Sequence, residues 1–499
     1  MPAVHPTPPL LPSPVVPLPG RMDGVHPVPL HHPRRVPRAL AAILALAAAL
    51  RLPGLWRYPL EQDELYTVLE SRLLWDVPLQ PGIDARPLYF LLQHALSWLL
   101  PDSPAGLRAA PFVFGMLGVW LAWRVGARLV GPSAGVLAAF LAAVAPWHLH
   151  ASGMARYWTL LFLLSAAFLL ALSRGYDADR PRDFALALAA LLAGMLTHPT
   201  FLFPAAGAAL GASLVTADGR PGWRWPSRRA WAWLWIPFLV TVALFFGVLK
   251  LAGRGDAVRN WGGRGWLASL RLVPAMVEWL TPAVVVAGIA GALLLLGERG
   301  AARRRWGMMT ITGCGATLVL LLAASTRTDV YADYAVAMLP LLFVSAGALA
   351  QLAAERMRAG AAVATAVLAA LLGAAVLPAA ASHLSDGTRF DYRPAFRHVQ
   401  RAAPGRLVLT WPLIVQRHYA PGLRAAELRG GPGRLDAWLA AEGEVWVIAS
   451  VKRYGIALDD SGAMAAWLAR RCRRDAAFER PRWDYRVHRV EVWRCTRDD

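Results

Sequence analysis

The residues best suited to chemistry lie between positions 61 and 94, where acidic, basic and aromatic side chains follow the first long apolar segment. Asp63 and Glu64 are adjacent carboxylates, and an ionised carboxylate can accept a proton from an attacking hydroxyl or amine. The alternative for Asp63 is structural, because an Asp side chain also caps the free N–H groups of an opening helical turn. The sequence leaves both interpretations open.

The apolar period predicts that these acids stand on an amphipathic helix. Its apolar face is expected to hold Leu65, Val68, Leu69 and Leu73, and its polar face Glu64, Thr67, Glu70 and Ser71. Such a helix lies along a membrane surface better than it crosses one. A second short helical pattern follows, opened by Arg86-Pro87-Leu88-Tyr89.

Further candidate side chains recur in segments that the topology argued below places on the same side of the membrane. Together with the two acids they are Arg86, Tyr89, Arg156, Tyr157, His198, Arg327, Tyr331 and Tyr334. Arginine matches a phosphate in charge and through paired hydrogen bonds, so the set suits an amphiphile with an anionic head. The alternatives are that Arg86 and Arg156 anchor helix ends by snorkelling and that the late tyrosines are interface aromatics.

The sequence predicts no cofactor. His148 and His150 alternate as metal ligands sometimes do, but no third ligand is evident, so ordinary hydrogen bonds are expected for both. Three cysteines exclude a Cys-rich metal site, and Cys314 lies in an apolar run. A divalent metal stays an open alternative without an evident ligand set.

Composition identifies a membrane protein that spans the bilayer many times. Of 499 residues, 57% are hydrophobic and the mean hydropathy is +0.40, with apolar runs of membrane-spanning length. The formal charge of +20 could suggest nucleic acid as a partner. However, the arginines lie in short loops between apolar segments, where topology requires them, and no nucleic-acid partner is predicted.

The positive-inside rule determines on which side of the membrane each loop lies. After the segment that begins at Ala39, apolar segments occur at about 107–123, 134–147, 158–173, 184–197, 200–216, 231–251, 272–296, 307–324, 335–352 and 360–380. If Leu88–Leu100 does not cross, the arginine clusters between them all face the cytoplasm. We therefore predict about eleven spans, with residues 52–106 as an outer loop that contains two surface helices.

The predicted domains are three. Residues 1–36 are expected to be a disordered, Pro-rich cytoplasmic tail, residues 37–381 a transmembrane domain, and residues 382–499 a small extracytoplasmic α/β domain. In the last domain, strands are predicted at 406–410, 445–449 and 485–495, and helices at 393–402, 434–441 and 462–471. An outer domain lies in an oxidising compartment, so a Cys472–Cys495 disulfide is predicted.

Over about residues 38–380 the chain resembles the polyprenyl-phosphate-dependent GT-C glycosyltransferases. This superfamily includes the protein O-mannosyltransferases and the bacterial transferase that puts aminoarabinose on lipid A. The resemblance rests on Asp63-Glu64 in a long first outer loop and on Arg86-Pro87-Leu88-Tyr89. It also rests on Arg156-Tyr157 in the second outer loop, on Asp329 to Pro340 before a late span, and on the soluble tail.

The resemblance implies a GT-C fold and a membrane glycosyltransferase in the bacterial inner membrane. Its donor would be a sugar on an undecaprenyl-phosphate-type lipid, transferred with inversion on the extracytoplasmic face. It implies that Asp63 is the catalytic base, that Glu64 supports it, and that Arg156 lies near the donor phosphate. One departure is that no Asp or Glu occurs between Asp102 and Asp177, where some members carry a further acid.

Two other classes of function stay open. One is a transporter or flippase for a lipid-linked sugar, which should carry ionisable groups near mid-membrane and show repeat symmetry. The other is a non-catalytic assembly protein that presents its outer domain. The sequence identifies neither the sugar nor the acceptor, which could be a lipid, a glycan or a protein.

Overall fold

The structure, a computed structural model, describes residues 38–72, 86–251, 270–326, 330–356, 360–428, 431–452, 455–456, 462–480 and 487–497. The predicted tail 1–36 and two residues of interest, Arg327 and Asp329, lie outside the described residues. Residues Ala39–Asp499 form one unit by their contacts, so the domain boundary expected at residue 382 stays a prediction.

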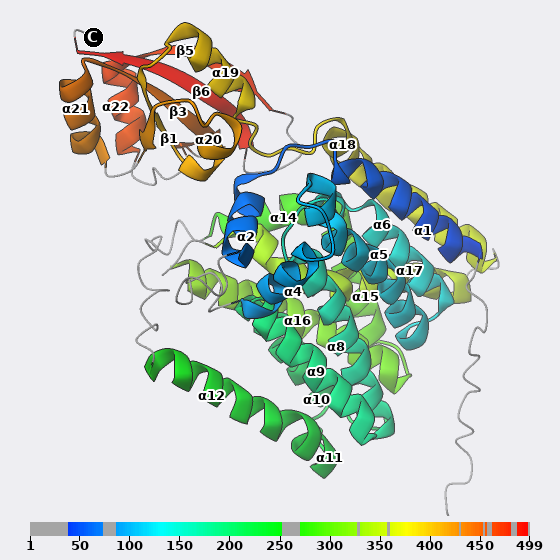
Figure 1. Cartoon of the computed structure of the whole chain (residues 1–499). Coiled ribbons are helices and arrows are strands. Elements are labelled where there is room, and N and C mark those ends of the chain that lie inside the picture. Colours follow the sequence, from blue (N-terminus) through cyan, green and yellow to red (C-terminus); the bar gives the residue numbers. More distant parts are fainter. Residues whose placement is uncertain are drawn as a thin grey trace, which may run out of the picture. The chain divides into compact units, whose positions relative to one another are not determined.

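Helices make up nearly all of the described structure before Ser385 (Figure 1). They are α1 (Arg38–Arg51), η1 (Leu52–Leu55), α2 (Gln62–Arg72), α4 (Pro87–Ser97), α5 (Pro104–Leu129), α6 (Pro132–Val144), α7 (Pro146–Ser152), α8 (Trp158–Ala178), α9 (Pro181–Thr197), η2 (Pro199–Phe201), α10 (Leu202–Ser213), α11 (Arg228–Ala230), η3 (Trp231–Trp235), α12 (Ile236–Leu251), α14 (Leu272–Leu280), α15 (Pro282–Leu296), α16 (Ala301–Ser325), η4 (Ala332–Met338), α17 (Leu339–Arg356) and α18 (Ala361–Ser385).

Six of the described helices are long and apolar enough to cross a membrane. They are Arg38–Leu55, α5, α8, α16, Ala332–Arg356 and α18. Two bent pairs, α6 with α7 at 62° and α14 with α15 at 90°, could each form one more span. The predicted segments at 184–197, 200–216 and 231–251 form the shorter helices α9, α10 and α12. The fold is therefore that of a polytopic membrane protein, and the count of about eleven spans stays a prediction.

The first predicted outer loop contains two short helices, α2 and α4, which pack against each other. Each has 11 residues and is about 16 Å long, half the thickness of a bilayer core. The ambiguous segment Leu88–Leu100 is thus too short to cross in a helical form. This agrees with the topology that treats it as a surface helix.

The predicted faces of α2 match its burial only in part. On the polar face Glu64, Thr67 and Ser71 are buried in the protein, and on the apolar face Leu65 is buried, whereas Leu69 is 43% exposed. The reason lies far along the chain, because Arg108 of α5 supplies Glu64 with a buried ionic partner. Asp63 is not the cap either: α2 begins at Gln62, and it is Glu64 that returns to the backbone N–H of Glu61, as in a capping box.

Close helix packing holds the scaffold together. In Figure 1, α8, α9, α10 and α16 run side by side, in agreement with their contacts. Gly207 of α10 faces α16 so closely that an added Cβ would lie 2.4 Å from the carbonyl oxygen of Thr312. Small residues commonly allow such approach between membrane helices.

A buried arginine holds the break between α6 and α7, from which the second outer loop continues. Arg51, at the end of α1, is 1% exposed and donates 2.8 Å hydrogen bonds to the carbonyl oxygens of Ala142 and Ala143. These carbonyls belong to the last turn of α6, where a cation is favourable. The same guanidinium contacts His148 Nδ1 at 2.8 Å and so fixes α7 as well.

After Ser385 the chain forms a mixed sheet with flanking helices. Its elements are α19 (Arg393–Ala402), β1 (Leu407–Thr410), α20 (Leu413–Tyr419), β2 (Ala425–Glu427), α21 (Gly431–Glu442), β3 (Glu444–Lys452), β4 (Gly455–Ile456), α22 (Ala463–Arg471), β5 (Cys472–Glu479) and β6 (Val487–Thr496). The strand order is β2-β1-β3-β6-β5, with β4 paired to β3. Parallel pairing joins β1 to β2 and β3, and antiparallel pairing joins β6 to β3 and β5.

The small α/β tail predicted from the sequence is confirmed, with additions. The three predicted strands correspond to β1, β3 and β6, and the three predicted helices to α19, α21 and α22. Strand β5 was not predicted, because it is an edge strand with five exposed residues in eight and no clean alternation. Cys472 and Cys495 face each other across β5 and β6 and form the predicted disulfide.

Candidate functional site

One face of α2 carries Asp63, Thr67 and Glu70, which the helical period places together. Arg156 of the second outer loop meets this face: its Nη1 donates to Thr67 Oγ1 at 3.1 Å and to the Asp63 carbonyl oxygen at 3.4 Å. The Asp63 carboxylate itself is partly buried and makes no hydrogen bond or ion pair within the described parts of the chain. It is therefore a carboxylate held beside an arginine with its oxygens unoccupied.

A second arginine approaches from the start of α4. Arg86 Nη1 donates to the Tyr157 hydroxyl at 2.7 Å, and its guanidinium lies 5.3 Å from the centre of the Tyr157 ring. The Arg156 guanidinium lies 5.0 Å from the same ring. Two cations that share one aromatic ring are stabilised by its face but repel each other, and an anion between them would relieve that repulsion.

Aromatic side chains surround Arg86 and Arg156. Tyr157 is 1% exposed, stacks on His198 at 5.2 Å and meets Tyr89 edge-on at 6.1 Å. Tyr334 lies 5.0 Å from His198, and Tyr331 lies 6.1 Å from Tyr334. The structure thus brings together predicted residues from the first loop, the second loop, the turn before η2 and η4.

His198 is a neutral member of this cluster. Burial lowers its pKa well below the ordinary value, and the charges of Arg86 and Arg156 lower it further. Its Nδ1 accepts a 3.2 Å hydrogen bond from the Thr200 amide, so the neutral ring carries its proton on Nε2. His198 can therefore donate one hydrogen bond within the cluster but cannot act as a cation there.

Arg156 has donor capacity left over. It is 8% exposed, and its Nε is buried without a hydrogen-bond partner in the described structure. Burial lowers the pKa of Arg156, but nearby Asp63, Tyr157 and Glu70 outweigh burial and raise it, so the group is a fixed cation. A buried, unsatisfied cationic donor is costly, and an anionic ligand is the partner that fits it.

Glu70 was not among the predicted site residues. Its Oε2 is buried without a partner in the described structure, and burial raises its pKa against the opposing charges of Arg156 and Arg86. The signal for it was present in the sequence, because Glu70 lies seven residues after Asp63 and so on the same helix face. The site therefore contains a second carboxylate, which comes from α2 and not from the second outer loop.

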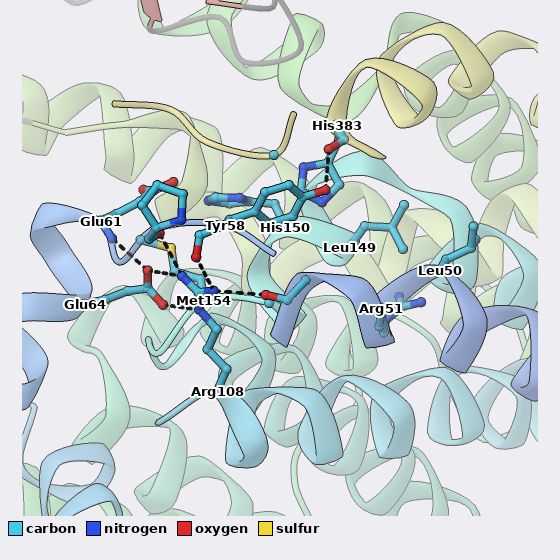
Figure 2. A pocket seen from close by; sticks show the side chains of 14 residues that line it. Leu50, Arg51, Tyr58, Glu61, Glu64, Arg108, Leu149, His150, Met154 and His383 are labelled. Atoms are coloured by element: carbon cyan, nitrogen blue, oxygen red, sulfur yellow. Dashed lines mark hydrogen bonds and ion pairs between the residues drawn. The ribbon is translucent and has the colours of Figure 1, made fainter. Parts of the chain in front are cut away.

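Glu64 is bound by Arg108 of α5, and Figure 2 shows the two side chains together. Its Oε1 accepts from Arg108 Nε at 2.7 Å and from the Ala155 amide at 2.8 Å. Its Oε2 accepts from Arg108 Nη2 at 2.8 Å and from the Glu61 amide at 2.9 Å. Each oxygen thus accepts two hydrogen bonds. The predicted support of Asp63 by Glu64 stays a prediction, and these contacts would allow Glu64 to support Asp63 only by fixing the position of α2. Arg108 was missed because it lies inside an apolar segment.

His148 and His150 have different hydrogen-bond partners. His148 Nδ1 contacts Arg51 at 2.8 Å, and His150 Nε2 accepts from Arg389 Nε at 3.1 Å. In the described residues, no group of three or more His, Cys, Asp or Glu side chains could hold a metal ion. Arg327 cannot be placed, because it lies outside the described residues.

Comparison with known proteins gives a family match over part of the chain. Residues 80–249 match the family model of dolichyl-phosphate-mannose-protein mannosyltransferases. The match covers Arg86, Arg156 and His198, whereas Asp63 and the η4 tyrosines lie outside it. No curated protein matches the chain by sequence.

The fold is shared with a solved structure over most of the chain. ArnT from Cupriavidus metallidurans in the apo state superposes with a TM-score of 0.57 at 15% identity, covering 91% of this chain and 97% of that one. The same ArnT bound to undecaprenyl phosphate gives a TM-score of 0.56, with the same identity and coverage. The chain thus matches a mannosyltransferase family model over residues 80–249 and shares the fold of ArnT over most of its length.

Proposed function

We propose that the protein is a membrane glycosyltransferase that uses a polyprenyl-phosphate-linked sugar, of the undecaprenyl-phosphate type. The observation that carries the proposal is the pair Arg86 and Arg156 around Tyr157, beside Asp63, whose carboxylate has no hydrogen-bond partner in the described structure. A cationic, aromatic cluster next to a carboxylate that has no hydrogen-bond partner in the described structure suits a phosphate leaving group and a base in one site. The ArnT of similar fold binds undecaprenyl phosphate, which supports the choice of lipid.

The proposed reaction is a single displacement with inversion. Asp63 accepts the proton of the acceptor hydroxyl or amine as that group attacks the anomeric carbon. The bond between this carbon and the phosphate oxygen breaks, and the lipid phosphate leaves with the electron pair. Arg156 and Arg86 stabilise the negative charge that grows on the departing oxygens. We further propose the extracytoplasmic face as the side of reaction, on the basis of the arginine-rich loops at the opposite helix ends.

The role of Arg156 is tested by its affinity for undecaprenyl phosphate, measured by native mass spectrometry on purified variants and normalised to the folded fraction. We expect affinity to fall from Arg to Lys to Ala, because Lys keeps the charge but loses the planar fork. Arg156→Ala is expected to lose about tenfold or more, a difference of about 1.4 kcal/mol or above. Arg182→Ala, an exposed arginine at the start of α9, is the matched control.

A well-folded Arg156→Ala protein with wild-type affinity for undecaprenyl phosphate would remove the phosphate role. In that outcome Arg156 is only an anchor at the end of a span, and Lys should replace it without loss.

The role of Asp63 is tested separately by Asp63→Asn, which keeps the shape of the side chain but not the base. General-base catalysis is worth about 10²- to 10⁴-fold, so transfer should fall by that factor while folding is unchanged. Thin-layer analysis of radiolabelled lipid-linked sugars reports the transfer and also identifies the sugar. Near-normal turnover in the variant would leave Asp63 without a catalytic role. No specific observation in the described structure favours the transporter or assembly-protein alternatives.

A further inference from the structure

The start of α2, which carries Asp63, is held by residues from beyond the last long helix. Glu61, the residue before α2, is 6% exposed. Its Oε1 accepts a hydrogen bond from the Arg389 amide at 3.2 Å, and its Oε2 lies 3.4 Å from Arg389 Nε. Arg389 belongs to the segment between α18 and α19, more than 320 residues from its partner.

Arg389 also holds the second outer loop. Its side chain is 3% exposed, and besides Glu61 it donates from Nε to His150 Nε2 at 3.1 Å and from Nη2 to Met154 Sδ at 3.5 Å. Its guanidinium lies 5.0 Å from the centre of the Trp147 ring. One side chain from the end of the membrane region thus joins the two loops that supply Asp63 and Arg156.

A second contact reaches the same turn from the tail sheet domain. The hydroxyl of Tyr419, at the end of α20, donates to the carbonyl oxygen of Leu60 at 3.0 Å. Helix α20 packs on α2, and Val68 of α2 lies in one apolar cluster with Ile414 and Tyr419. Leu60 and Glu61 are therefore fixed from the tail, whereas Glu64 is fixed from α5.

A small polar cavity lies behind this turn and shows how closely the parts fit. It has a volume of about 10 Å³, near the minimum that holds one water molecule. Glu61, Glu64, His150 and Met154 line it, and they are drawn in Figure 2. The turn therefore has little space into which it could shift without losing contacts.

We propose that Arg389 and Tyr419 are positioning residues that orient Asp63 toward Arg156 by fixing Leu60 and Glu61, which makes the tail domain a working part of the active site. The inference rests on the proposed function, because Asp63 is the base in it. The Asp63 carboxylate has no hydrogen-bond partner of its own in the described structure, so its position depends on that of the helix start. A displacement of about 1 Å at a reacting group can cost about a hundredfold in rate.

The experiment measures turnover per folded molecule, affinity for undecaprenyl phosphate, and hydrogen exchange of residues 60–72. Arg389→Gln alone strands a buried carboxylate and risks misfolding, so Arg389→Gln is combined with Glu61→Gln to restore neutrality. Tyr419→Phe removes only one hydroxyl. Arg397→Gln, at an exposed position in the neighbouring α19, is the matched control.

We expect the neutral double variant to fold, to bind undecaprenyl phosphate within about threefold of wild type, and to lose about ten- to hundredfold in kcat. Exchange at residues 60–72 should rise, and Tyr419→Phe should show the same changes to a smaller extent. Folded variants with wild-type kcat, or with unchanged exchange at residues 60–72, would overturn the proposal. If the wild type transfers no sugar from any polyprenyl phosphate, the proposed function fails, and the exchange measurement alone then decides whether Arg389 and Tyr419 hold α2.

Discussion

Replacing Glu64 separates its role from that of its neighbour Asp63. Arg108 is 1% exposed, and Glu64 is the acid with which it forms an ion pair in the described structure. Its remaining hydrogen bonds go to the carbonyl oxygens of Gly54, Tyr58 and Pro59. Glu64→Ala would therefore leave the buried Arg108 guanidinium with hydrogen bonds to neutral carbonyl groups only.

The cost follows from these contacts. Breaking a buried ion pair by removing one partner destabilises a protein by about 3–5 kcal/mol. The amides of Glu61 and Ala155 also lose their acceptor, and each unsatisfied buried group adds about 1–3 kcal/mol unless water replaces it. Because the whole stability of a folded protein is about 5–15 kcal/mol, Glu64→Ala should be among the most damaging single changes in the chain.

The assay is thermal unfolding of purified protein in detergent, followed by tryptophan fluorescence. Asp63→Ala is the matched control, since it also removes a carboxylate from α2 but one without a hydrogen-bond partner in the described structure, and about 1 kcal/mol or less is expected for it. Combining Glu64→Leu with Arg108→Met should recover part of the loss, because an apolar pair can replace a buried ion pair. An unfolding temperature unchanged in Glu64→Ala would refute this reasoning, and Glu64 would again be a candidate reacting group.

Three further outcomes are expected. Burial raises the pKa of Glu61 from 4.5 to about 7, so its favourable contribution is complete below pH 4.5 and lost as pH rises to 7. The loss is at most about 3 kcal/mol. Glu61→Gln should make the unfolding temperature less dependent on pH between pH 5 and 8. Reduction of the Cys472–Cys495 disulfide should destabilise the tail by about 3 kcal/mol, seen as faster proteolysis of its strands. In intact spheroplasts, an impermeant maleimide should label a cysteine at Arg424 but not one at Arg299, and the reverse pattern would overturn the topology.

The elements of this chain were easier to predict from the sequence than their contacts. Helix α2 follows from its apolar period, but the period does not tell which face meets protein. That face depends on Arg108, 44 residues away from Glu64. The pairing of Arg156 with Thr67 spans 89 residues and is likewise invisible to a local pattern.

The tail illustrates both the success and the limit of sequence patterns. Strands β1 and β3 are buried apolar runs, which single them out in any window of sequence. Strand β5 is Cys-Arg-Arg-Asp-Ala-Ala-Phe-Glu, a polar run that exists as a strand because it pairs with β6. The disulfide was predictable because compartment and count left one pair of cysteines in the tail.

Adjacent carboxylates on a helix point about 100° apart, so Asp63 and Glu64 of α2 meet different parts of the protein. Glu64 points at the wall of the bundle, where Arg108 and two amides occupy its oxygens. Asp63 lies beside Arg156 of the second outer loop, whose buried Nε has no hydrogen-bond partner in the described structure. Four hydrogen bonds restrict the motion of the Glu64 carboxylate. The rigidity of Glu64 thus helps to fix the position of Asp63, which is the base in the proposed reaction.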